Sequence, residues 1–334
     1  MPGPAPSKKN KTPTPAKKRP SAGLTRPMKD AIRRSGYLME QRLVPVLEDR
    51  GFFCTPNAGF ADPETGDARE IDIFAIDAAW YSTQHNILAG IFPVLLIQCK
   101  NLEAPLVFFT QDQIPVREIA GPPLVSGVPL EVRRHGRIDD LADVLEVEEF
   151  HHYYRTRRLA SQFCAVYQRD KGQKSRWVAS HELEGTGNLY RGLVLPLVKA
   201  VEAYSHEHMD SWEWDPKTET INLQFYYPIA VTTGELYECF VGGQRPRYRR
   251  VHRVQFIRRH EAKQFSGDYR IDVVTESGLG RLLDTIGREM QEMADRVKKH
   301  RCILVRAARE IAAAALSEGE ISPETKQAQE TDHP

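Results

Sequence analysis

The sequence predicts an α/β fold, because helical and strand-like patterns follow one another along the chain. Residues 30–50 have the apolar spacing of a helix, which Gly51 ends. Short strand-like runs follow at 52–55 and 70–76, and both contain β-branched or aromatic residues. The apolar run 91–99 is long and continuous enough for a buried central strand. This order of elements is typical of a sheet that is flanked by helices.

The second half of the chain continues the mixture of patterns. The sequence predicts a helical stretch within 138–165 and a helix over 188–208. Strand-like runs follow at 221–232, 236–241, 251–259 and 269–275, and a long helix over 277–316 closes the fold.

The composition is that of a soluble globular protein, with 41% hydrophobic and 27% charged residues among 334. The five cysteines lie far apart, at 54, 99, 164, 239 and 302, without the CxxC spacing of a zinc site. We therefore expect a reducing, cytoplasmic location. No apolar stretch approaches the ~20 residues that cross a bilayer, so we expect a protein that is neither membrane-spanning nor secreted.

The formal net charge of +1 conceals two oppositely charged ends. Residues 1–27 carry seven Lys and Arg, no acid and little to bury, so we expect a disordered basic tail. Such a tail either binds phosphates without sequence preference or keeps the protein soluble. Residues 317–334 carry a charge of −4 and are expected to form a disordered acidic tail. The body between them carries −2, so nucleic-acid affinity has to come from a local patch or from the basic tail.

Glu40 lies in the middle of the apolar stripe of the first predicted helix. At ~100° per residue, the side chains of Tyr37, Leu43, Val44 and Leu47 fall within about 60° of it. A carboxylate that faces a core costs free energy unless a cation or a hydrogen-bond donor meets it. Glu40 is therefore a candidate functional residue, although a single acid in such a position also arises by chance.

Polar side chains also occur on two of the predicted strands. Asp72 lies in the strand REIDIFAID, and Gln98 and Lys100 end the long apolar strand on one shared face. Asp72 should lie inside or at the rim of a covered sheet, whereas Gln98 and Lys100 are explained, taken singly, as a solvent-exposed strand end. Taken with Glu40, they predict one site, because an acid on a helix, an acid on a strand and Gln-x-Lys on a neighbouring strand can converge. Hard oxygen ligands suit Mg²⁺, and a lysine can hold a water or a phosphate oxygen.

This ordered set resembles the PD-(D/E)XK nuclease superfamily, and within it the Mrr-like branch. The resemblance lies in SGYLMEQRLVPVLEDRGF with Glu40, in EIDIFA with Asp72, and in LLIQCKN with Gln98 and Lys100. The Gln-x-Lys form in place of Glu-x-Lys is one for which this branch is known.

The resemblance implies a restriction-endonuclease-like αβββαβ core, in which helices flank a mixed central sheet. Residues 28–100 would form its first half, with the helix, three strands and the site. Residues 188–316 would form its second half, with the helix 188–208, the strand YYPIAVTT, additional strands and a C-terminal helix. Residues 101–187 would then be a long insertion.

The resemblance also implies a role for each residue of the site, with Mg²⁺ or Mn²⁺ as cofactor. Asp72 would be the central metal ligand. The amide oxygen of Gln98 and the backbone carbonyl of Cys99 would be neutral ligands. Glu40 would hold a water at the metal or a second ion, and Lys100 would orient or activate the attacking water.

A run of arginines at 245–259, RPRYRRVHRVQFIRR, is the candidate nucleic-acid surface. Arginine forks match phosphates, and the ring of Tyr248 can stack on a base. Strand alternation leaves neither face purely basic, so part of the run would simply cover acidic surface. The cluster HHYYRTRR at 151–158 is better explained by a solvated helix face, and Asp272 by a structural role. We expect DNA contact from Arg247, Arg249, Arg250 and Arg253.

The predicted function is hydrolysis of phosphodiester bonds by a Mg²⁺-dependent nuclease, with double-stranded DNA as substrate and a role in restriction or genome defence. The alternative is a nuclease-like fold that has lost hydrolysis and serves as a DNA-binding or assembly module, since Gln98 removes one negative charge from the metal site. A nuclease of RNA or of DNA junctions would use the same site. A homodimer and a separate partner protein both stay open. The sequence contains no Walker A, dinucleotide-binding or serine-hydrolase motif.

Overall fold

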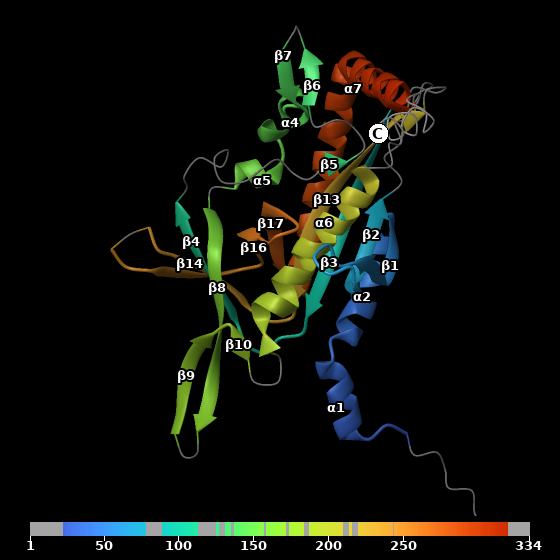
Figure 1. Cartoon of the computed structure of the whole chain (residues 1–334). Helices are drawn as coiled ribbons and strands as arrows, with labels where there is room; N and C mark the ends of the chain where they lie inside the picture. Colours follow the sequence, from blue (N-terminus) through green and yellow to red (C-terminus); the bar gives the residue numbers. More distant parts are fainter. Residues whose placement is uncertain are drawn as a thin grey trace, which may run out of the picture.

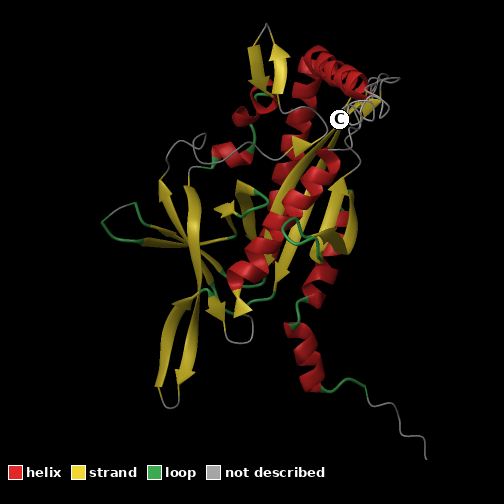
Figure 2. Cartoon of the chain, in the orientation of Figure 1, coloured by secondary structure: helices red, strands yellow, loops and turns green. Residues whose placement is uncertain are grey.

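The computed structural model describes residues 23–77, 89–112, 125–126, 131–134, 137–156, 158–171, 174–183, 187–209, 214–215, 220–242 and 244–319. These residues form a mixed α/β fold in which helices flank a large mixed sheet (Figure 1, Figure 2). The predicted α/β class is therefore confirmed. Most of the two predicted tails lies outside the described residues, but Arg26 and Pro27 belong to the first helix and Ser317 belongs to the last.

The N-terminal helical segment consists of two helices and not of the single helix predicted over 30–50. Helix α1 spans Arg26–Arg34, and α2 spans Tyr37–Glu48. Gly36 separates them with a φ of 88°, a left-handed conformation that glycine adopts without steric cost and that interrupts an α-helix. The helix that carries Glu40 therefore begins directly after Gly36.

Four strands form the part of the sheet that holds the candidate site. They are β1 (Phe52–Ala61), β2 (Ala68–Asp77), β3 (Ala89–Lys100) and β13 (Thr220–Thr232). β1 pairs antiparallel with β2 and β2 antiparallel with β3, whereas β13 lies parallel to β3. The predicted central strand is β3. Every side chain from Ile91 to Ile97 is buried, as expected for a strand that is covered on both faces.

Helices cover both faces of this part of the sheet (Figure 1). The hydrophobic cluster on one face joins α2, α7 (Leu279–Gly319) and side chains of β3 such as Ile97. The cluster on the other face joins α6 (Leu195–Met209) and side chains such as Leu96. A π-helical turn, η2 (Tyr190–Val194), leads directly into α6. The ends of β2 and β3 therefore lie between α2 on one side and η2 on the other.

The sheet continues beyond β13 in the order β1-β2-β3-β13-β17-β16-β8-β4-β14-β15. The added strands are β17 (Ser266–Thr275), β16 (Arg253–Glu261), β8 (Arg158–Lys171), β4 (Leu106–Asp112), β14 (Leu236–Phe240) and β15 (Arg247–Val251). β4 and β8 come from the predicted insertion 101–187. That segment therefore adds strands to the main sheet and does not form a separate unit.

The helical stretch predicted over 138–165 is wrong, because residues 141–155 form only the short helices α4 (Leu141–Val144), η1 (Val147–Glu149) and α5 (His152–Arg155) and the chain enters β8 at Arg158. β8 pairs with β4 and β16, and this long-range pairing outweighs the local helical pattern. The remaining described elements are β5 (Val125–Ser126), β6 (Glu131–Arg134), β7 (Arg137–Asp140), β9 (Lys174–Ser180), β10 (Glu182–Leu183), β11 (Gly187–Asn188), β12 (Trp214–Asp215) and η3 (Glu276–Gly278).

The other predicted elements of the second half agree with the structure. The helix 188–208 corresponds to η2 and α6, and the final helix corresponds to α7. The runs 221–232, 236–241 and 269–275 correspond to β13, β14 and β17. The run 251–259 differs, because the chain turns at His252 and divides the arginine-rich segment between β15 and β16.

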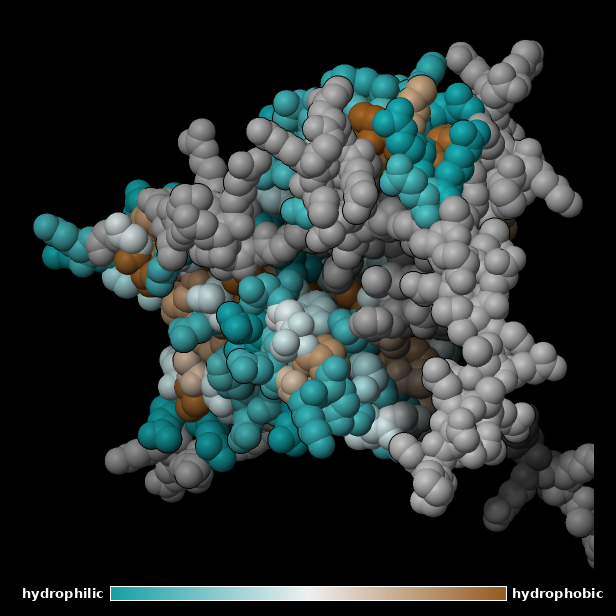
Figure 3. All heavy atoms as spheres, turned by 45° about the horizontal axis from the view of Figure 1, so that its top comes forward, coloured by the Kyte–Doolittle hydropathy of each residue, from teal (hydrophilic) through white to brown (hydrophobic). Residues whose placement is uncertain are grey.

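Hydrophilic side chains predominate among the described residues of the face shown in Figure 3, where hydrophobic side chains form only small groups. Within the described ranges, no helix combines the length and the apolar character that crossing a membrane requires.

Candidate active site

The site begins where β2 and β3 separate. The two strands pair as far as Ile73 and Ile97, and Asp72 is the next residue of β2. Beyond this point a side-chain hydrogen bond replaces the backbone pairing. The backbone N–H of Cys99 donates to Asp72 Oδ2 at 2.6 Å. The side chain of Asp72 therefore continues the sheet at the point where its backbone pairing ends.

The side chain of Gln98 completes this arrangement. Its Nε2 donates to the same oxygen, Asp72 Oδ2, also at 2.6 Å. The Gln98 amide and the Cys99 N–H therefore both fix one oxygen of Asp72. Among the described residues, the other oxygen, Oδ1, has no hydrogen bond, so it is available to a ligand.

Glu40 approaches from α2. It lies in the first turn of that helix and is only 7% exposed, beside the buried side chains of Met39 and Leu43. No hydrogen bond or ion pair to the carboxylate of Glu40 occurs within the described part of the chain. The predicted burial of Glu40 is therefore confirmed. Tyr37, which was expected on the same buried stripe, is 65% exposed, because it is the first residue of α2 and lies beyond the edge of the core.

The surroundings of Glu40 and Asp72 disfavour the charged form of both carboxyl groups. Burial and the nearby negative charge of Asp72 raise the pKa of Glu40 above its usual range. Burial also raises the pKa of Asp72, and it outweighs the hydrogen bonds from Cys99 and Gln98 and the charge of Lys100, all of which lower it. The fold therefore holds two carboxylates in a position where a positive ion would stabilise both.

Lys100 ends β3 on the side of η2. Among the residues described, no partner forms a hydrogen bond or an ion pair with its ammonium group. A Cβ atom added at Gly192, in the π-helical turn, would lie 3.0 Å from Lys100 Nζ. The absence of a side chain at Gly192 therefore leaves room for the ammonium group, and π-helical turns of this kind are frequent at functional sites.

Cys99 contributes backbone atoms and not its thiol. Burial raises the pKa of the thiol well above its usual range, and the negative charges of Asp72, Glu40 and Glu276 raise it further. The thiol therefore stays protonated, which is unfavourable for a nucleophile or a metal ligand. The role of the Cys99 carbonyl as a ligand stays a prediction.

The structure adds two residues that were not predicted, Glu276 and Arg42. Glu276 directly follows β17, and Arg42 lies on α2 two residues after Glu40. Arg42 Nε and Nη2 donate to the two oxygens of Glu276 at 2.8 and 3.0 Å. A signal did exist, because Glu276 follows a predicted strand just as Lys100 ends one, and the carboxyl ends of parallel strands share one edge of a sheet.

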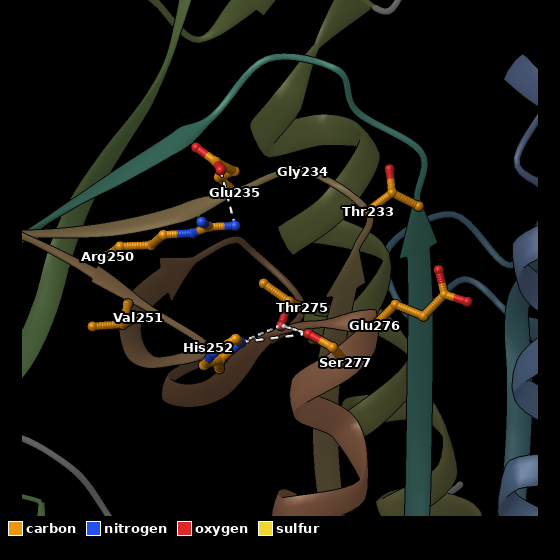
Figure 4. A pocket seen from close by; sticks show the side chains of 9 residues that line it. All are labelled: Thr233, Gly234, Glu235, Arg250, Val251, His252, Thr275, Glu276 and Ser277. Carbon is orange, nitrogen blue, oxygen red and sulfur yellow. Dashed lines mark hydrogen bonds and ion pairs between the residues drawn. The ribbon is translucent and has the colours of Figure 1, made fainter.

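Two pockets flank the site along this edge. Figure 4 shows the first, a pocket of 480 Å³ in which His252, Thr275 and Ser277 form a hydrogen-bonded group and Glu276 lies beside them. It adjoins Lys100 through Thr233, whose backbone N–H donates to the Lys100 carbonyl at 3.4 Å.

The second pocket, of 790 Å³, lies on the other side of the site. It is lined by Glu70, two residues before Asp72, and by Arg191, which precedes Gly192. Residues close in sequence or by hydrogen bond to Asp72 and Lys100 therefore line two separate pockets.

The predicted arginine surface is largely paired within the protein. Arg249 Nη2 lies 2.6 Å from Glu238, and Arg250 Nη2 lies 2.9 Å from Glu235. The guanidinium of Arg247 lies 4.9 Å from the centre of the Phe240 ring. DNA contact by these arginines stays a prediction, but each of them already has an internal partner.

The fourth arginine of that set belongs to a second cluster of buried charges, which we call the His152 network (His152, Arg253, Asp272 and Glu289). His152 Nδ1 lies 2.7 and 2.8 Å from the two oxygens of Glu289, and Nε2 lies 2.9 Å from Asp272 Oδ2. Arg253 Nε donates to Asp272 Oδ1 at 2.8 Å. The expected solvated helix face at 151–158 is therefore wrong for His152, which is 6% exposed.

Charges balance within the His152 network. Burial alone would lower the pKa of His152, but the charge of Asp272 and hydrogen bonds to both acids outweigh it and raise the pKa. Burial alone would raise the pKa of Asp272, but the charges of Arg253 and His152 lower it to about 2. Two anions and two cations therefore stabilise one another, in agreement with the structural role expected for Asp272.

The same region contains the atoms of a candidate metal site. Ligand atoms of His151, His152 and Glu289 all lie within 4.8 Å of one another. Both ring nitrogens of His152 already contact carboxylates, however. The two imidazole rings are also stacked, with centroids 4.8 Å apart and an interplanar angle of 19°, so their in-plane lone pairs do not converge on one point. We therefore interpret this group as an ion-pair network.

Comparison with known proteins returns no match. No family model fits the sequence, and no curated protein or solved structure is significantly similar to the chain. The function therefore has to be inferred from the geometry of the site.

Proposed function

We propose that the protein is a metal-dependent nuclease that hydrolyses phosphodiester bonds in DNA, with Mg²⁺ or Mn²⁺ as cofactor. One observation supports this best. Gln98 and the Cys99 N–H hold one oxygen of Asp72 where β2 and β3 separate, beside the strand that Lys100 ends. The buried acid Glu40 of α2 is close enough for its charge and that of Asp72 to interact. Two acids and a lysine of this kind match the requirements of phosphodiester hydrolysis, which needs a bound cation and a positioned water.

The order of the elements supports a restriction-endonuclease-like core. Helix α2 is followed by the antiparallel strands β1, β2 and β3, by helix α6, and by β13, which lies parallel to β3. This is the αβββαβ order that the resemblance of the sequence implies. The strands from β17 to β15 would then be additions to this core at the side of β13.

The atoms of the site suit a hard divalent cation. Asp72 Oδ1 and the carboxylate of Glu40 are oxygen donors, and the Gln98 amide oxygen and the Cys99 carbonyl would be neutral donors. When bound there, the cation would polarise the phosphoryl group and stabilise the charge that develops during hydrolysis.

The side chains of the protein would perform the remaining steps. Gln98 and the Cys99 N–H hold Asp72 in one orientation by binding one of its oxygens. Lys100 donates hydrogen bonds to the attacking water or to a phosphate oxygen. Glu40 would hold that water at the cation, or hold a second ion.

A second candidate function is a nuclease-like module that binds DNA or assembles with partners without hydrolysis. The observation in its favour is the hydrogen bond from Gln98 Nε2 to Asp72. This bond occupies an oxygen of the acid that would be the central metal ligand. A neutral amide in place of a carboxylate also lowers the affinity for a divalent cation. The two candidates differ in whether divalent ions bind at Asp72.

Cleavage of supercoiled plasmid tests the proposal. We expect nicking or linearisation by the wild-type protein with Mg²⁺ or Mn²⁺, and none with EDTA. Asp72→Ala and Lys100→Ala should abolish it, whereas Asp295→Asn, which removes an exposed acid of α7, should not change it. Cleavage that persists in Asp72→Ala would overturn the proposed site.

Direct measurement of Mn²⁺ binding by electron paramagnetic resonance separates the two candidate functions. Binding that is abolished in Asp72→Ala supports the nuclease. Wild-type protein that is folded, binds DNA and neither binds Mn²⁺ nor cleaves single- or double-stranded DNA or RNA would favour the binding module.

A further inference from the structure

Two elements project beyond the end of the sheet at which β3 finishes and the candidate site lies. Figure 1 shows α1 and the hairpin formed by β8 and β9 extending past the end of β3, toward the bottom of the view. Lys100 is the last residue of β3, so both elements extend on the side of the candidate site.

Most of the cations on α1 have no partner among the described residues. None of its residues is buried. Within the described part of the chain, the side chains of Arg26, Lys29 and Arg34 form no ion pair or hydrogen bond. Arg33 has one contact, a 3.4 Å ion pair with Asp30 in which its own side chain is 72% exposed. Such an exposed pair contributes little, so four cations oppose a single acid on this helix.

α1 is also fixed to the candidate site. Asn101, the residue after Lys100, donates from Nδ2 to the backbone carbonyl of Arg33 at 2.5 Å. Thr233 Oγ1 donates to the side-chain oxygen of Asn101 at 2.7 Å. The C-terminal end of α1, which carries Arg33 and Arg34, therefore lies at the end of β3.

The β8–β9 hairpin carries the second group of cations. β8 pairs with β4 only as far as Ala165, and from there to Lys171 its described partner is β9. Arg169 and Arg176 lie directly opposite each other in this pairing, and Arg176 is exposed. Trp177, next to Arg176, is 68% exposed.

The arginines of β15, from which the sequence predicted DNA contact, differ from the cations of α1 in their partners. There, Arg249 and Arg250 form ion pairs with acids of β14 and its preceding turn. On α1 most of the cations lack such partners among the described residues, and the sequence before α1 adds six Lys and Arg without an acid. The unpaired cations of α1 therefore add positive charge at the end of β3 that holds the candidate site, whereas Arg249 and Arg250 of β15 each face an acid.

We propose that α1 and the β8–β9 hairpin are two arms that hold double-stranded DNA across the candidate active site. The inference rests on the proposed function, which supplies DNA as the substrate class. A duplex fits better than a single strand, because an α-helix and a two-stranded ribbon are the two elements that the major groove admits. The cations of the two arms would bind backbone phosphates, and Trp177 would pack against the sugar or base edges.

Apolar side chains on α1 and just before it allow a competing explanation. Leu24, Met28 and Ile32, spaced by four residues, are 50, 49 and 39% exposed. A basic helix with such a stripe can also bind an anionic membrane surface. Binding to vesicles is therefore an outcome that the experiment has to include.

The test measures DNA affinity without catalysis. Fluorescence anisotropy of a labelled duplex is followed in EDTA for the wild type, for the α1 variant Arg26→Ala/Lys29→Ala/Arg34→Ala and for the hairpin variant Arg176→Ala/Trp177→Ala. We expect the α1 variant to bind at least about tenfold more weakly, and the slope of log affinity against log salt to fall by about 0.9 for each phosphate that is no longer bound. The hairpin variant should bind several-fold more weakly.

The matched control is Arg288→Ala/Lys298→Ala/Arg306→Ala, which removes three exposed cations from α7. It should bind as the wild type does. Equal affinity of the arm variants and this control would overturn the inference, even if plasmid cleavage shows that the proposed function is correct. If the protein cleaves nothing but its DNA binding depends on the arms, the inference about the arms stands. The proposed nuclease function would then be wrong.

Binding of the wild type to vesicles of phosphatidylcholine and phosphatidylserine, without affinity for the duplex, would also overturn the inference. Tighter binding to a single strand or to double-stranded RNA than to the DNA duplex would do the same, because the arms would then recognise another substrate.

Discussion

The candidate site and the His152 network both contain a pair of acids, but the two pairs differ in how their charge is balanced. In the His152 network, Asp272 contacts Arg253 and His152, and Glu289 contacts both the ring and the backbone of His152. In the candidate site, Glu40 has no ion pair within the described ranges, and Asp72 has only neutral hydrogen-bond donors on one oxygen.

The pKa values follow this difference. The pKa of Asp272 is lowered to about 2, although this residue is completely buried, because its partners outweigh the cost of burial. The pKa of Asp72 is raised, because burial outweighs its hydrogen bonds. One acid pair thus stabilises the fold in its charged state, whereas the charges of the other pair are unfavourable for the fold. This contrast distinguishes a structural cluster from a candidate functional one.

The largest expected effect is a loss of cleavage in Asp72→Asn without a loss of stability. Asp72→Asn should reduce metal-dependent plasmid cleavage about 1000-fold or more, because the proposed cation loses its central ligand. The melting temperature should stay the same or rise, since the charge of Asp72 is unfavourable in the metal-free fold. Cleavage assays and thermal unfolding in EDTA measure the two effects. A large fall in melting temperature would contradict the contrast between the two acid pairs.

Asp272→Asn should have the opposite result. Removing this charge leaves His152 and Arg253 without their shared partner in a buried position, which costs about 3 kcal/mol of unfolding free energy. Urea denaturation measures the loss. Cleavage by the fraction that stays folded should be unchanged, and a specific loss of activity with normal stability would show that the network belongs to the catalytic machinery.

The pH dependence of stability should reflect the His152 network. The raised pKa of His152 means that its contribution is complete below its ordinary pKa of 6.5 and is lost as the pH rises through the raised value. The lowered pKa of Asp272 means that its contribution is present above 3.8 and is lost as the pH falls toward about 2, a loss on the order of 2 kcal/mol. Stability should therefore be highest between these limits.

Urea denaturation at a series of pH values measures this profile. The variant His152→Gln should remove the decline on the alkaline side while it lowers stability at about pH 5, where the histidine is charged. An unchanged alkaline decline in that variant would assign the effect to another group.

The smallest expected effect concerns the space around Lys100. Gly192→Ala places a Cβ atom 3.0 Å from Lys100 Nζ, which displaces the ammonium group and should reduce cleavage about tenfold, the effect of about 1.4 kcal/mol on the barrier. Gly287→Ala is the matched control, because nothing lies within 4 Å of a Cβ atom in this helical position. It should leave cleavage unchanged and raise stability by about 0.5–1 kcal/mol. Equal cleavage by both variants would exclude close packing of Lys100 on η2 in the active state.

Patterns within short segments predicted a large part of this fold. The continuous apolar run of β3 and the helical stripe around Glu40 are local signals, and each agrees with the burial in the structure. The left-handed Gly36, which divides the first helix, is local as well but was not recognised. β8 could not be predicted, because its identity as a strand depends on pairing with β4 and β16 and not on its own sequence.

The same limit applies to the site. Glu40, Asp72, Gln98 and Lys100 were found because they interrupt apolar patterns within one segment of 61 residues, counted from 40 to 100. Glu276 was missed, because its relevance depends on β17 lying beside β13, and β13 beside β3. The sequence also did not predict that the arginines of β15 pair with acids of β14 and its preceding turn. These charges meet only after the two strands pair.

The parallel pairing of β3 with β13 has a consequence for the synthesis of the protein. All four predicted site residues are present once residue 100 has been made, but β3 lacks its parallel neighbour until residues 220–232 follow. Thr233, which closes this junction, comes 131 residues after its hydrogen-bond partner Leu102. At about 5–20 residues per second, the interval is on the order of ten seconds, during which the apolar side chains of β3 lack one of their two flanking strands. A pairing of such long range also slows folding, so the nascent chain should depend on chaperones during this interval.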